Sequence, residues 1–398
     1  MKNGYLSQYF DGIIAKRLSA VEADPGVSNQ HEYNGTVAMK KLLGTERCKF
    51  DAKFLYIDDE DTPITENGFL TWYDAREHHP TRSEYRFFYP TTAVSQAANR
   101  NDLLFVCLKP DKTILVVIAA DNSTVGAQLC WLFGVDAGNR FVVSDDFDSE
   151  DSHLEYASKC ILEQLGIEIE EQAPNYLDEM LSRFGGQFPS TKTFSEYARS
   201  TLPGADPREN ADAVLIEWLD REETLFRTLE RHLIQERLTS GFGDVDDFIA
   251  YSLSVQNRRK SRVGQALENH FEVILQTLGV KYDRTKVTEN RSKPDFIFPG
   301  IRQYRDPTFP EARLTMLGAK STCKDRWRQV LAEADRIEDK HLLTLESAIS
   351  THQTDEMQSK HLQLVVPKSI HRSYTSAQQS WLMNVNEFLS LVMRRQNV

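Results

Sequence analysis

Three residues in the second half of the chain have side chains and positions suited to phosphodiester chemistry. Asp295 begins a hydrophobic, strand-like segment, where a carboxylate needs a charged partner or a metal ion. Lys320 ends a second strand-like segment, 314–320, and Glu333 lies on a helix expected over 324–338. Two carboxylates and an ammonium group that meet at one point suit a divalent cation and a phosphate ester. We therefore expect a Mg²⁺-dependent phosphodiesterase site, with Asp295 and Glu333 as metal ligands.

Two of these residues have a simpler interpretation. Asp295 could cap a turn that leads into its strand, and Lys320 could be a solvated residue at a strand edge.

A third acid, Glu268, is expected on a helix over 263–278, directly after a run of positive charge. The cations of that run are Arg258, Arg259, Lys260 and Arg262. A preceding helix is expected over 246–255, so the run would lie at the junction of two helices. It is either a solvated junction or a surface that contacts DNA phosphates.

The elements that must position these residues differ between the two halves of the chain. The first half contains short apolar and aromatic runs separated by Pro, Asn, Asp and Gly, which predicts a mostly-β barrel with flanking helices. From 187 to 398, helical patterns alternate with short strands, which indicates a mixed α/β domain. We expect domains over 1–166 and 187–398, joined by an acidic linker at 167–186 that contains Pro and Gly.

Composition and charge set limits on the class of protein. The chain has 398 residues, of which 40% are hydrophobic and 27% charged, as in globular proteins of two or three domains. Its net charge of −12 disfavours a simple polyanion binder, although positive charge can be confined to one cleft. The cysteine count of five is odd, the N-terminus has no secretory pattern, and no apolar stretch reaches the ~20 residues of a membrane span. We expect a cytoplasmic protein with no membrane association.

Several motifs of the second half closely resemble the EcoRII family of restriction endonucleases. The matching stretches are 241–243, 255–262 with Gly264, Leu267 and Glu268, 293–296, 320–329, 333–335 and 364–367. This resemblance implies a PD-(D/E)XK nuclease fold and Mg²⁺-dependent cleavage of double-stranded DNA. It implies a metal-binding role for Asp295 and a catalytic role for Lys320.

One position departs from the usual nuclease motif, which places an acid two residues before the lysine. Gly318 occupies that position here. In the EcoRII-like branch the acid comes from the following helix, and Glu333 fits this displaced position. The resemblance also implies that Glu268 is an additional helix acid and that Tyr304 is an active-site tyrosine, although a lone loop tyrosine is often structural.

The family's base-reading motif corresponds to Lys324, Asp325 and Arg326. Lys and Arg donate to guanine O6 and N7, and Asp accepts from cytosine N4, so this triplet could read adjacent C·G pairs. The resemblance therefore implies a target with flanking CC and GG, in the form CCWGG.

The first half resembles the effector domain of the same family, a B3-like pseudobarrel with two DNA-contacting arms. The similar stretches are 15–20 with the loop through 28–31, and 73–76 with 81–86. The residues expected to contact effector DNA are Arg76, Arg82, Glu84 and Arg86, with Lys16 and Arg17 as weaker candidates. An exposed charged hairpin is the alternative, and the pair His78-His79 lacks a third ligand at metal-binding spacing.

Together these observations predict a homodimeric type IIE restriction endonuclease, activated when further copies of its target bind the effector domain. Each active site would cut one strand, so a double-strand break needs two subunits. Two other classes stay open. A catalytically silent DNA-binding regulator would keep the base-reading triplet without hydrolysis, and a repair or structure-specific nuclease would need no such triplet.

Overall fold

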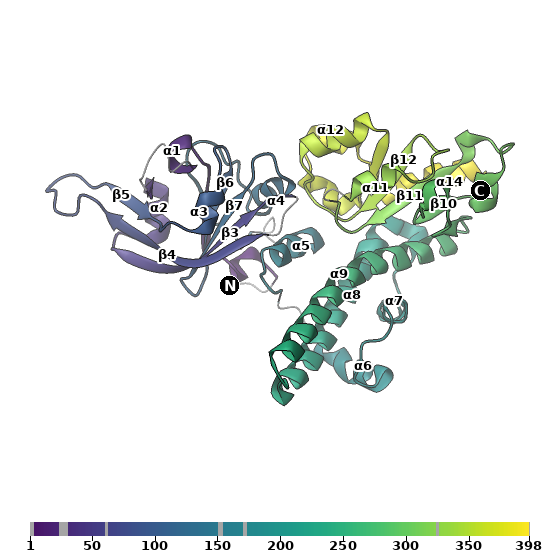
Figure 1. Cartoon of the computed structure of the whole chain (residues 1–398), viewed down its shortest axis with the longest axis horizontal. Coiled ribbons are helices and arrows are strands. Elements are labelled where there is room, and N and C mark those ends of the chain that lie inside the picture. The colour runs from purple at the N-terminus through teal and green to yellow at the C-terminus, as the bar shows by residue number, and fades with distance from the viewer. Residues whose placement is uncertain are drawn as a thin grey trace. The chain divides into compact units, whose positions relative to one another are not determined.

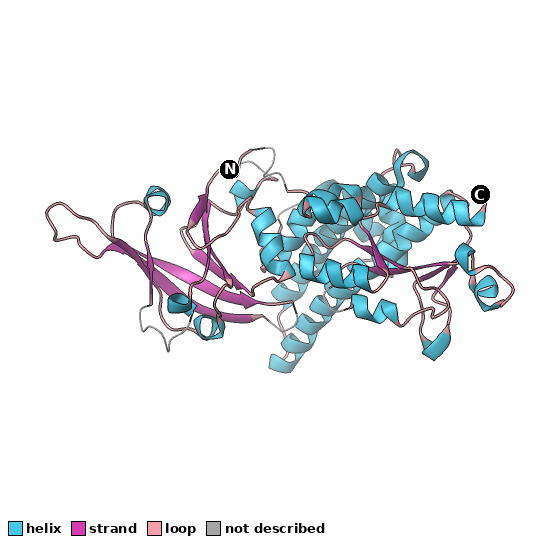
Figure 2. Cartoon of the chain, turned by 90° about the horizontal axis from the view of Figure 1, so that it is seen from above, coloured by secondary structure: helices cyan, strands magenta, loops and turns pink. Residues whose placement is uncertain are grey.

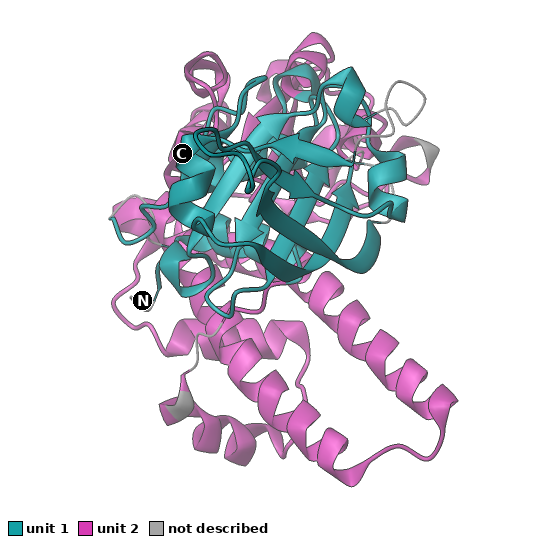
Figure 3. Ribbon diagram, turned by 90° about the vertical axis from the view of Figure 1, so that its left-hand side faces the viewer, with its two compact units in different colours: residues 1–166, 348–353 teal, residues 167–347, 354–398 magenta. Residues whose placement is uncertain are grey.

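The structure is a computed structural model that describes residues 4–23, 31–59, 63–149, 154–169, 173–323 and 326–397. The chain forms two compact units, coloured separately in Figure 3. One comprises Met1–Gly166 with Ala348–Gln353, and the other comprises Ile167–Ser347 with Thr354–Val398. We refer to them as the N-terminal and the C-terminal unit.

The N-terminal unit is built on one sheet of eight strands. Their order is β2 (Glu32–Asn34), β5 (Tyr85–Phe88), β4 (Ile64–Asp74), β3 (Cys48–Ile57), β7 (Ile114–Ala119), β6 (Leu103–Leu108), β1 (Gly12–Arg17) and β8 (Val142–Ser144). Among the described strands of this sheet, only β3 and β7 pair in parallel. The short helices of this unit are η1 (Leu6–Gln8), α1 (Ala20–Ala23), α2 (Val37–Leu43), α3 (Ala93–Ala97), α4 (Thr124–Leu132) and α5 (Tyr156–Gln164). The mostly-β composition predicted for this half is therefore observed (Figure 2).

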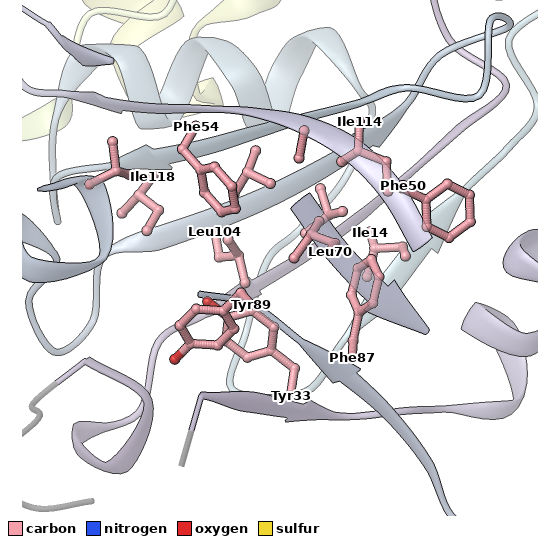
Figure 4. Close-up of a cluster of buried hydrophobic side chains, with 14 of the residues drawn as sticks. Ile14, Tyr33, Phe50, Phe54, Leu70, Phe87, Tyr89, Leu104, Ile114 and Ile118 are labelled. Atoms are coloured by element: carbon pink, nitrogen blue, oxygen red, sulfur yellow. The ribbon is translucent and has the colours of Figure 1, made fainter. Parts of the chain in front are cut away.

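This sheet is curled around an apolar core. β6 and β7 are buried along their whole length, and Phe54, Phe87 and Leu104 are among the side chains packed inside the curl (Figure 4). The ring of Tyr33 on edge strand β2 lies 6.0 Å from that of Phe141, which immediately precedes the opposite edge strand β8. No hydrogen-bonded ladder joins these two edges within the described residues. The result is a partly closed barrel, and its assignment to the B3-like type stays a prediction.

The C-terminal unit has a five-stranded mixed sheet. Its order is β13 (Leu362–Val365), β12 (Lys340–Thr344), β11 (Thr315–Lys320), β10 (Phe296–Phe298) and β9 (Asp283–Arg284). β11, β12 and β13 run parallel, whereas β10 is antiparallel to both its neighbours. The helices from 174 onward are η3 (Pro174–Tyr176), α6 (Leu177–Phe184), α7 (Thr191–Ser200), α8 (Pro207–Ser240), α9 (Val245–Thr277), η4 (Glu289–Arg291), α10 (Ile301–Arg305), η5 (Glu311–Arg313), α11 (Trp327–Leu331), α12 (Thr351–Ser359), η6 (Lys368–Ser373), α13 (Ser376–Trp381) and α14 (Val385–Gln396).

Aromatic packing joins the sheet of this unit to two helices. Phe296 on β10 makes an edge-on contact with Phe271 of α9, at 5.4 Å between ring centroids. Phe298 on the same strand makes a similar contact with Phe388 of α14, at 5.8 Å. Because side chains alternate along a strand, Phe296 and Phe298 face the same side, so α9 and α14 cover one face of the sheet. This packing fixes Asp295, the residue before β10, relative to α9.

The helix that carries the basic run and the predicted linker both differ from the sequence-based predictions. α9 is one continuous helix where two helices with a junction at the basic run were expected. The run continues the helix because it pairs with the neighbouring α8: Arg259 contacts Glu230 at 2.7 Å, and Arg262 pairs with Glu223. The segment 167–186, predicted as a linker, contains η3 and α6. Leu177, Met180, Leu181 and Phe184 share one face of α6, and Met180 is fully buried.

A buried histidine predicts how the stability of the C-terminal unit depends on pH. His341 on β12 is 3% exposed and lies against Phe388. Burial lowers the pKa of His341 from 6.5 to about 4, and the positive charge of Arg395 adds to the effect. The unfolded state therefore binds more protons, so stability is present above pH 6.5 and is lost as the pH falls toward 4. The loss from this group amounts to about 3 kcal/mol.

Substitution isolates this contribution. We expect a His341→Gln variant to lose less stability than the wild type over the same acid range, when unfolding is measured by chemical denaturation. His361→Gln is the matched control, because its side chain is 60% exposed. Equal acid sensitivity of the wild type and His341→Gln would contradict the prediction.

Candidate active site

Asp295 and Lys320 form the centre of the candidate site. β10 and β11 pair in a register that sets Phe296 opposite Leu317, so Asp295 lies beside the end of β11. One carboxylate oxygen, Asp295 Oδ2, accepts from Lys320 Nζ and from the backbone N–H of Ala319, each at 2.7 Å. Both side chains of the ion pair are 14% exposed. The structure therefore brings together the predicted metal ligand and the predicted catalytic lysine.

The contacts of Gly318 explain why an acid is missing from the usual position. A Cβ atom at Gly318 would lie 2.9 Å from Val330 Cγ2 on α11 and 3.5 Å from Leu342 on β12. Such a separation is too short for real side chains, so α11 occupies the space that an acidic side chain at this position would need. The acid must then come from another element.

Glu333 lies just beyond α11, in a turn and not inside a helix as predicted. α11 ends at Leu331, and Ala334 has a positive φ of 50°, which is incompatible with a continuing helix. Lys340 donates to the carbonyl oxygen of Ile337 at 2.6 Å and helps to fix this turn. The predicted helix over 324–338 is thus shortened, because tertiary contacts stabilise the turn that holds Glu333.

The electrostatics of Glu333 show that it shares a site with Asp295. Burial raises the pKa of Glu333 to about 7, the negative charge of Asp295 adds to the rise, and Lys320 and Lys340 oppose it. Its Oε2 atom is buried and has no hydrogen-bond partner among the described residues. A buried carboxylate oxygen of this kind is costly unless a cation or a proton satisfies it.

Glu268 approaches the same centre from α9. Burial raises the pKa of Glu268, the hydrogen bond from Arg284 opposes the rise, and the charge of Asp295 adds to it. Arg284 on β9 donates through one guanidinium nitrogen to Glu268 and through the other to Glu272, both at 2.7 Å. The four residues Glu268, Asp295, Lys320 and Glu333 are therefore electrostatically coupled.

Arg284 was not singled out from the sequence. A signal for it exists: Glu268 and Glu272 are like charges at i and i+4 on one helix, a destabilising pair unless an outside cation bridges them. The cation lies 12 residues beyond Glu272, on a strand of two residues. A strand that short has no detectable pattern, which is why sequence reasoning missed it.

Tyr304 belongs to a neighbouring hydrogen-bond network. Its hydroxyl group donates to Glu289 at 2.5 Å and accepts from the backbone N–H of Arg336 at 3.3 Å. Its side chain is 3% exposed. Arg336 in turn donates to the carbonyl oxygen of Tyr304 at 2.6 Å. The structure thus places Tyr304 where it supports the turn that follows Glu333. Among the interactions described, Tyr304 makes no direct contact with Asp295 or Lys320, and its catalytic role stays a prediction.

The acidic residues fit a hard divalent cation. Asp295 and Glu333 supply oxygen donors, and the orphaned Oε2 of Glu333 lacks only a positive partner. No group of three or more His, Cys, Asp or Glu side chains in the described part of the chain is arranged to hold a metal alone. Mg²⁺ is usually held by one or two carboxylates and completes its shell with water and substrate phosphate, so two acids are enough to hold it.

The predicted DNA-contacting residues of this unit have different environments. Lys324 and Asp325 lie outside the described residues, whereas Arg326 is exposed directly before α11. In the basic run, Lys260 is exposed and Arg258 lies 4.2 Å from the ring of Phe188. Arg262 differs from the prediction, because it is 5% exposed and paired with Glu222 and Glu223. A guanidinium group committed to two acids in the interior is not available to a phosphate.

The predicted effector residues lie on the N-terminal unit. Arg76 and Arg82 are exposed on the loop that joins β4 to β5, which projects from the sheet (Figure 1). Glu84 lies between two cations: it pairs with Arg76 at 2.6 Å and also with Arg86.

The two weaker candidates are held by acids of the same unit. Lys16 is 7% exposed and pairs with Glu22 at 2.7 Å, so its prediction as a DNA contact does not fit its position. Arg17 pairs with Asp121, also at 2.7 Å. Part of the first arm, residues 24–30, lies outside the described residues.

Comparison with known proteins finds a family match that covers the candidate site. Residues 226–389 match the family model described as EcoRII C terminal. Glu268, Asp295, Lys320 and Glu333 all lie inside the matched residues. The match agrees with the restriction-endonuclease-like fold predicted for the C-terminal half.

Curated relatives cover part of the chain. It is 41% identical over 210 residues to the type II restriction enzyme EcoRII of Escherichia coli, an alignment that covers 51% of this chain and 50% of that enzyme. It is 28% identical over 112 residues to the type II restriction enzyme SsoII of Shigella sonnei, which covers 25% of this chain and 36% of that enzyme. The chain thus spans about half, or less, of the length of the curated relatives it matches.

Solved structures of two restriction endonucleases are also similar to the chain. Metal-depleted Ecl18kI in complex with uncleaved, modified DNA has a TM-score of 0.46 at 17% identity, over 57% of this chain and 86% of Ecl18kI. The PspGI–substrate DNA complex has a TM-score of 0.45 at 15% identity, over 53% of this chain and 94% of PspGI.

No described helix of the present chain is both long and apolar enough to cross a bilayer.

Proposed function

We propose that this protein is a type II restriction endonuclease that makes Mg²⁺-dependent double-strand breaks in DNA. The observation that carries the proposal is the meeting of Asp295, Lys320 and Glu333 inside an EcoRII C-terminal domain. These side chains come from the residue before β10, the end of β11 and a turn, and the shared environment raises the pKa of Glu333 to about 7 through burial and the charge of Asp295. Perturbed acids in such a cluster are typical of functional sites.

The chain's own residues would divide the chemistry as follows. Asp295 and Glu333 would hold Mg²⁺, which when bound polarises the scissile phosphate. Asp295 also fixes the ammonium group of Lys320 at 2.7 Å, so that its charge is already in place to offset negative charge developing on the phosphate oxygens. Glu268, held by Arg284, would add a further negative charge next to the cation.

We assign target recognition to the segment between β11 and α11. Lys324, Asp325 and Arg326 follow the catalytic lysine by four to six residues, so the base-reading side chains and the cleavage centre would be carried on one short stretch of backbone. Donors to guanine and an acceptor for cytosine suit a CC/GG-containing site, and we propose CCWGG.

The N-terminal unit is proposed to bind further copies of the target as an effector domain. The exposed Arg76 and Arg82 of the β4–β5 loop are the contacts that its structure favours. Glu84 neutralises Arg76 and Arg86 in the free protein, and these arginines could exchange this acid for phosphate. Occupation of this unit would activate cleavage by a homodimer.

Incubation of a sequenced plasmid with the full chain tests the proposal. We expect linear product with Mg²⁺, none with EDTA, and ends that map to one sequence. An excess of a short duplex that carries the site should stimulate cleavage of a single-site plasmid, and Arg82→Ala should reduce the stimulation. Ends that follow DNA shape in place of sequence would favour the structure-specific nuclease. Specific binding without any cut would favour the silent regulator.

Arg284 predicts a measurable positioning effect within this site. Its guanidinium fork holds Glu268, so Arg284→Ala should lower the single-turnover cleavage rate by roughly 10- to 100-fold, with little change in DNA affinity. Arg284→Lys should recover only part of the rate, because a lysine cannot bridge two carboxylates in the same geometry.

Glu272→Gln is the matched control for Arg284. It removes the other ion pair of the same guanidinium group and leaves the contact with Glu268 intact. We expect its cleavage rate to stay within about threefold of the wild type. If Glu272→Gln and Arg284→Ala lose the same activity, the effect reflects general loss of structure and the positioning role is wrong.

A further inference from the structure

One surface of the C-terminal unit carries a cluster of exposed apolar side chains. Of the nine large hydrophobic residues that are exposed in the described part of the chain, five lie within 238–253. They are Leu238, Val245, Phe248, Ile249 and Leu253. Four of them are on the first turns of α9, beyond the loop that joins it to α8, and the two long helices lie side by side (Figure 1). Exposed apolar clusters of this kind mark interaction surfaces.

The exposed face of α9 can be defined residue by residue. An α-helix turns 100° per residue, so Asp246, Ile249, Leu253, Gln256 and Lys260 form one stripe. All five are exposed, and Ile249 and Leu253 are 47% and 52% exposed. We call these residues the α9 stripe. It extends over 14 residue steps, or about 21 Å at the helical rise.

Neighbouring side chains of α9 are occupied elsewhere, which separates the stripe from the rest of the helix. Phe248 and Tyr251 pack against the ring of Phe242, at 5.2 and 5.6 Å. Arg259 pairs with Glu230 of α8. Asp247 pairs with Arg237 of α8, at 2.7 Å. The stripe is therefore the side of α9 that faces away from α8.

The charges of the α9 stripe are arranged so that it complements itself. Asp246 is at one end, Lys260 is at the other, and the residues between them carry no charge. Leu253 is midway, because each charged residue lies seven positions from it. Two copies packed antiparallel about Leu253 would set Asp246 of each copy against Lys260 of the other, with the apolar residues buried between them.

We propose that the α9 stripe is the dimer contact of this protein and that its occupant is the same stripe of a second copy, related by a two-fold axis at Leu253. The inference rests on the proposed function only in that cleavage of two strands needs two subunits. It assigns Lys260 to the partner subunit and not to DNA phosphate. An unpaired apolar helix face with opposite charges at its two ends favours this occupant over a nucleic acid, which would meet both Asp246 and two exposed hydrophobic side chains.

Sedimentation of the full-length protein without DNA tests the contact. We expect a concentration-dependent dimer for the wild type, and monomer for Leu253→Glu, because the two new carboxylates would face each other across the axis. Val37→Glu is the matched control: it adds the same charge at an exposed hydrophobic residue on α2 of the N-terminal unit, and it should dimerise as the wild type does. A dimer that persists in Leu253→Glu overturns the proposal.

A charge exchange separates the specific pairing from a general effect on folding. Asp246→Lys and Lys260→Asp should each weaken dimerisation by roughly tenfold, because the two-fold axis turns two attractive pairs into repulsive ones. The double variant restores opposite charges and should recover dimerisation to within about threefold of the wild type. No recovery, or loss of DNA binding by Lys260→Asp without loss of the dimer, would instead identify this face as something other than the dimer contact.

Cleavage by the same variants distinguishes this proposal from the proposed function. If the protein is a nuclease and the contact is correct, Leu253→Glu should nick plasmid DNA where the wild type linearises it. Absence of Mg²⁺-dependent cleavage by the wild type refutes the proposed function and leaves the sedimentation result unaffected. Unchanged linearisation by a dimeric Leu253→Glu protein refutes the contact and leaves the proposed function intact.

Discussion

Lys320→Ala is expected to lower the rate of DNA cleavage by roughly 100- to 1,000-fold while specific DNA binding is retained. The ammonium group is held 2.7 Å from Asp295, so its charge is already oriented before substrate arrives. Such a preorganised charge acts mainly on the transition state, and its loss should lower the single-turnover rate more than the affinity. Single-turnover cleavage and a gel-shift assay with EDTA measure the two quantities.

Lys281→Ala is the control for this substitution. Lys281 is an exposed lysine of the same unit, and its described contacts are made by its backbone. We expect full activity from it. A Lys320→Ala protein that is folded and cuts at the wild-type rate would show that Lys320 is a strand-edge residue without a catalytic role.

Glu333→Gln should abolish cleavage and yet stabilise the metal-free protein at neutral and alkaline pH. Burial and the charge of Asp295 raise the pKa of Glu333 from 4.5 to about 7 in the folded state. The native state therefore keeps a proton that the unfolded state releases, and stability is lost as the pH rises from 4.5 to about 7. Glutamine keeps the shape of the Glu333 side chain and removes its negative charge. The variant should gain ~2 kcal/mol above this range, after allowance for partial exposure of the carboxyl, and nothing below it.

Unfolding measured against pH with EDTA tests this prediction, and Mg²⁺ provides a second readout. Added Mg²⁺ should stabilise the wild type more than Glu333→Gln, because the ion would bind only the native site. Glu338→Gln is the matched control, since Glu338 is an exposed residue of the same turn region. A Glu333→Gln protein that is less stable than the wild type at alkaline pH would contradict the assignment.

The parts of the site that depend on local pattern were predictable from the sequence. Asp295 and Lys320 were placed at the ends of two apolar strands, and those strands are neighbours in the sheet. Adjacent strands in sequence often pair, so the ion pair between these residues follows from pattern and topology. Glu333 was identified as the displaced acid, but the helix predicted around it was wrong. The turn at Ala334 that replaces this helix depends on contacts from Lys340 and Tyr304.

The errors concern residues whose partners are distant in the sequence. Arg262 reads as part of a basic surface, yet its partner Glu223 is on another helix, 39 residues earlier. Lys16 is buried beside Glu22 because α1 folds back on β1, which no period-2 pattern indicates. A cluster of cations in a sequence therefore does not show which of them face solvent. That depends on how the helices and strands pack.

Binding of Mg²⁺ to the protein–DNA complex tests the central claim most directly. Calorimetric titration would use Lys320→Ala protein bound to a duplex with the mapped target site, in which cleavage is slow enough for binding to be observed. We predict saturable Mg²⁺ binding that is lost when Asp295→Asn is added to the same variant. Mg²⁺ binding that is unchanged by Asp295→Asn would show that the metal ion lies elsewhere and that these residues do not form the cleavage centre.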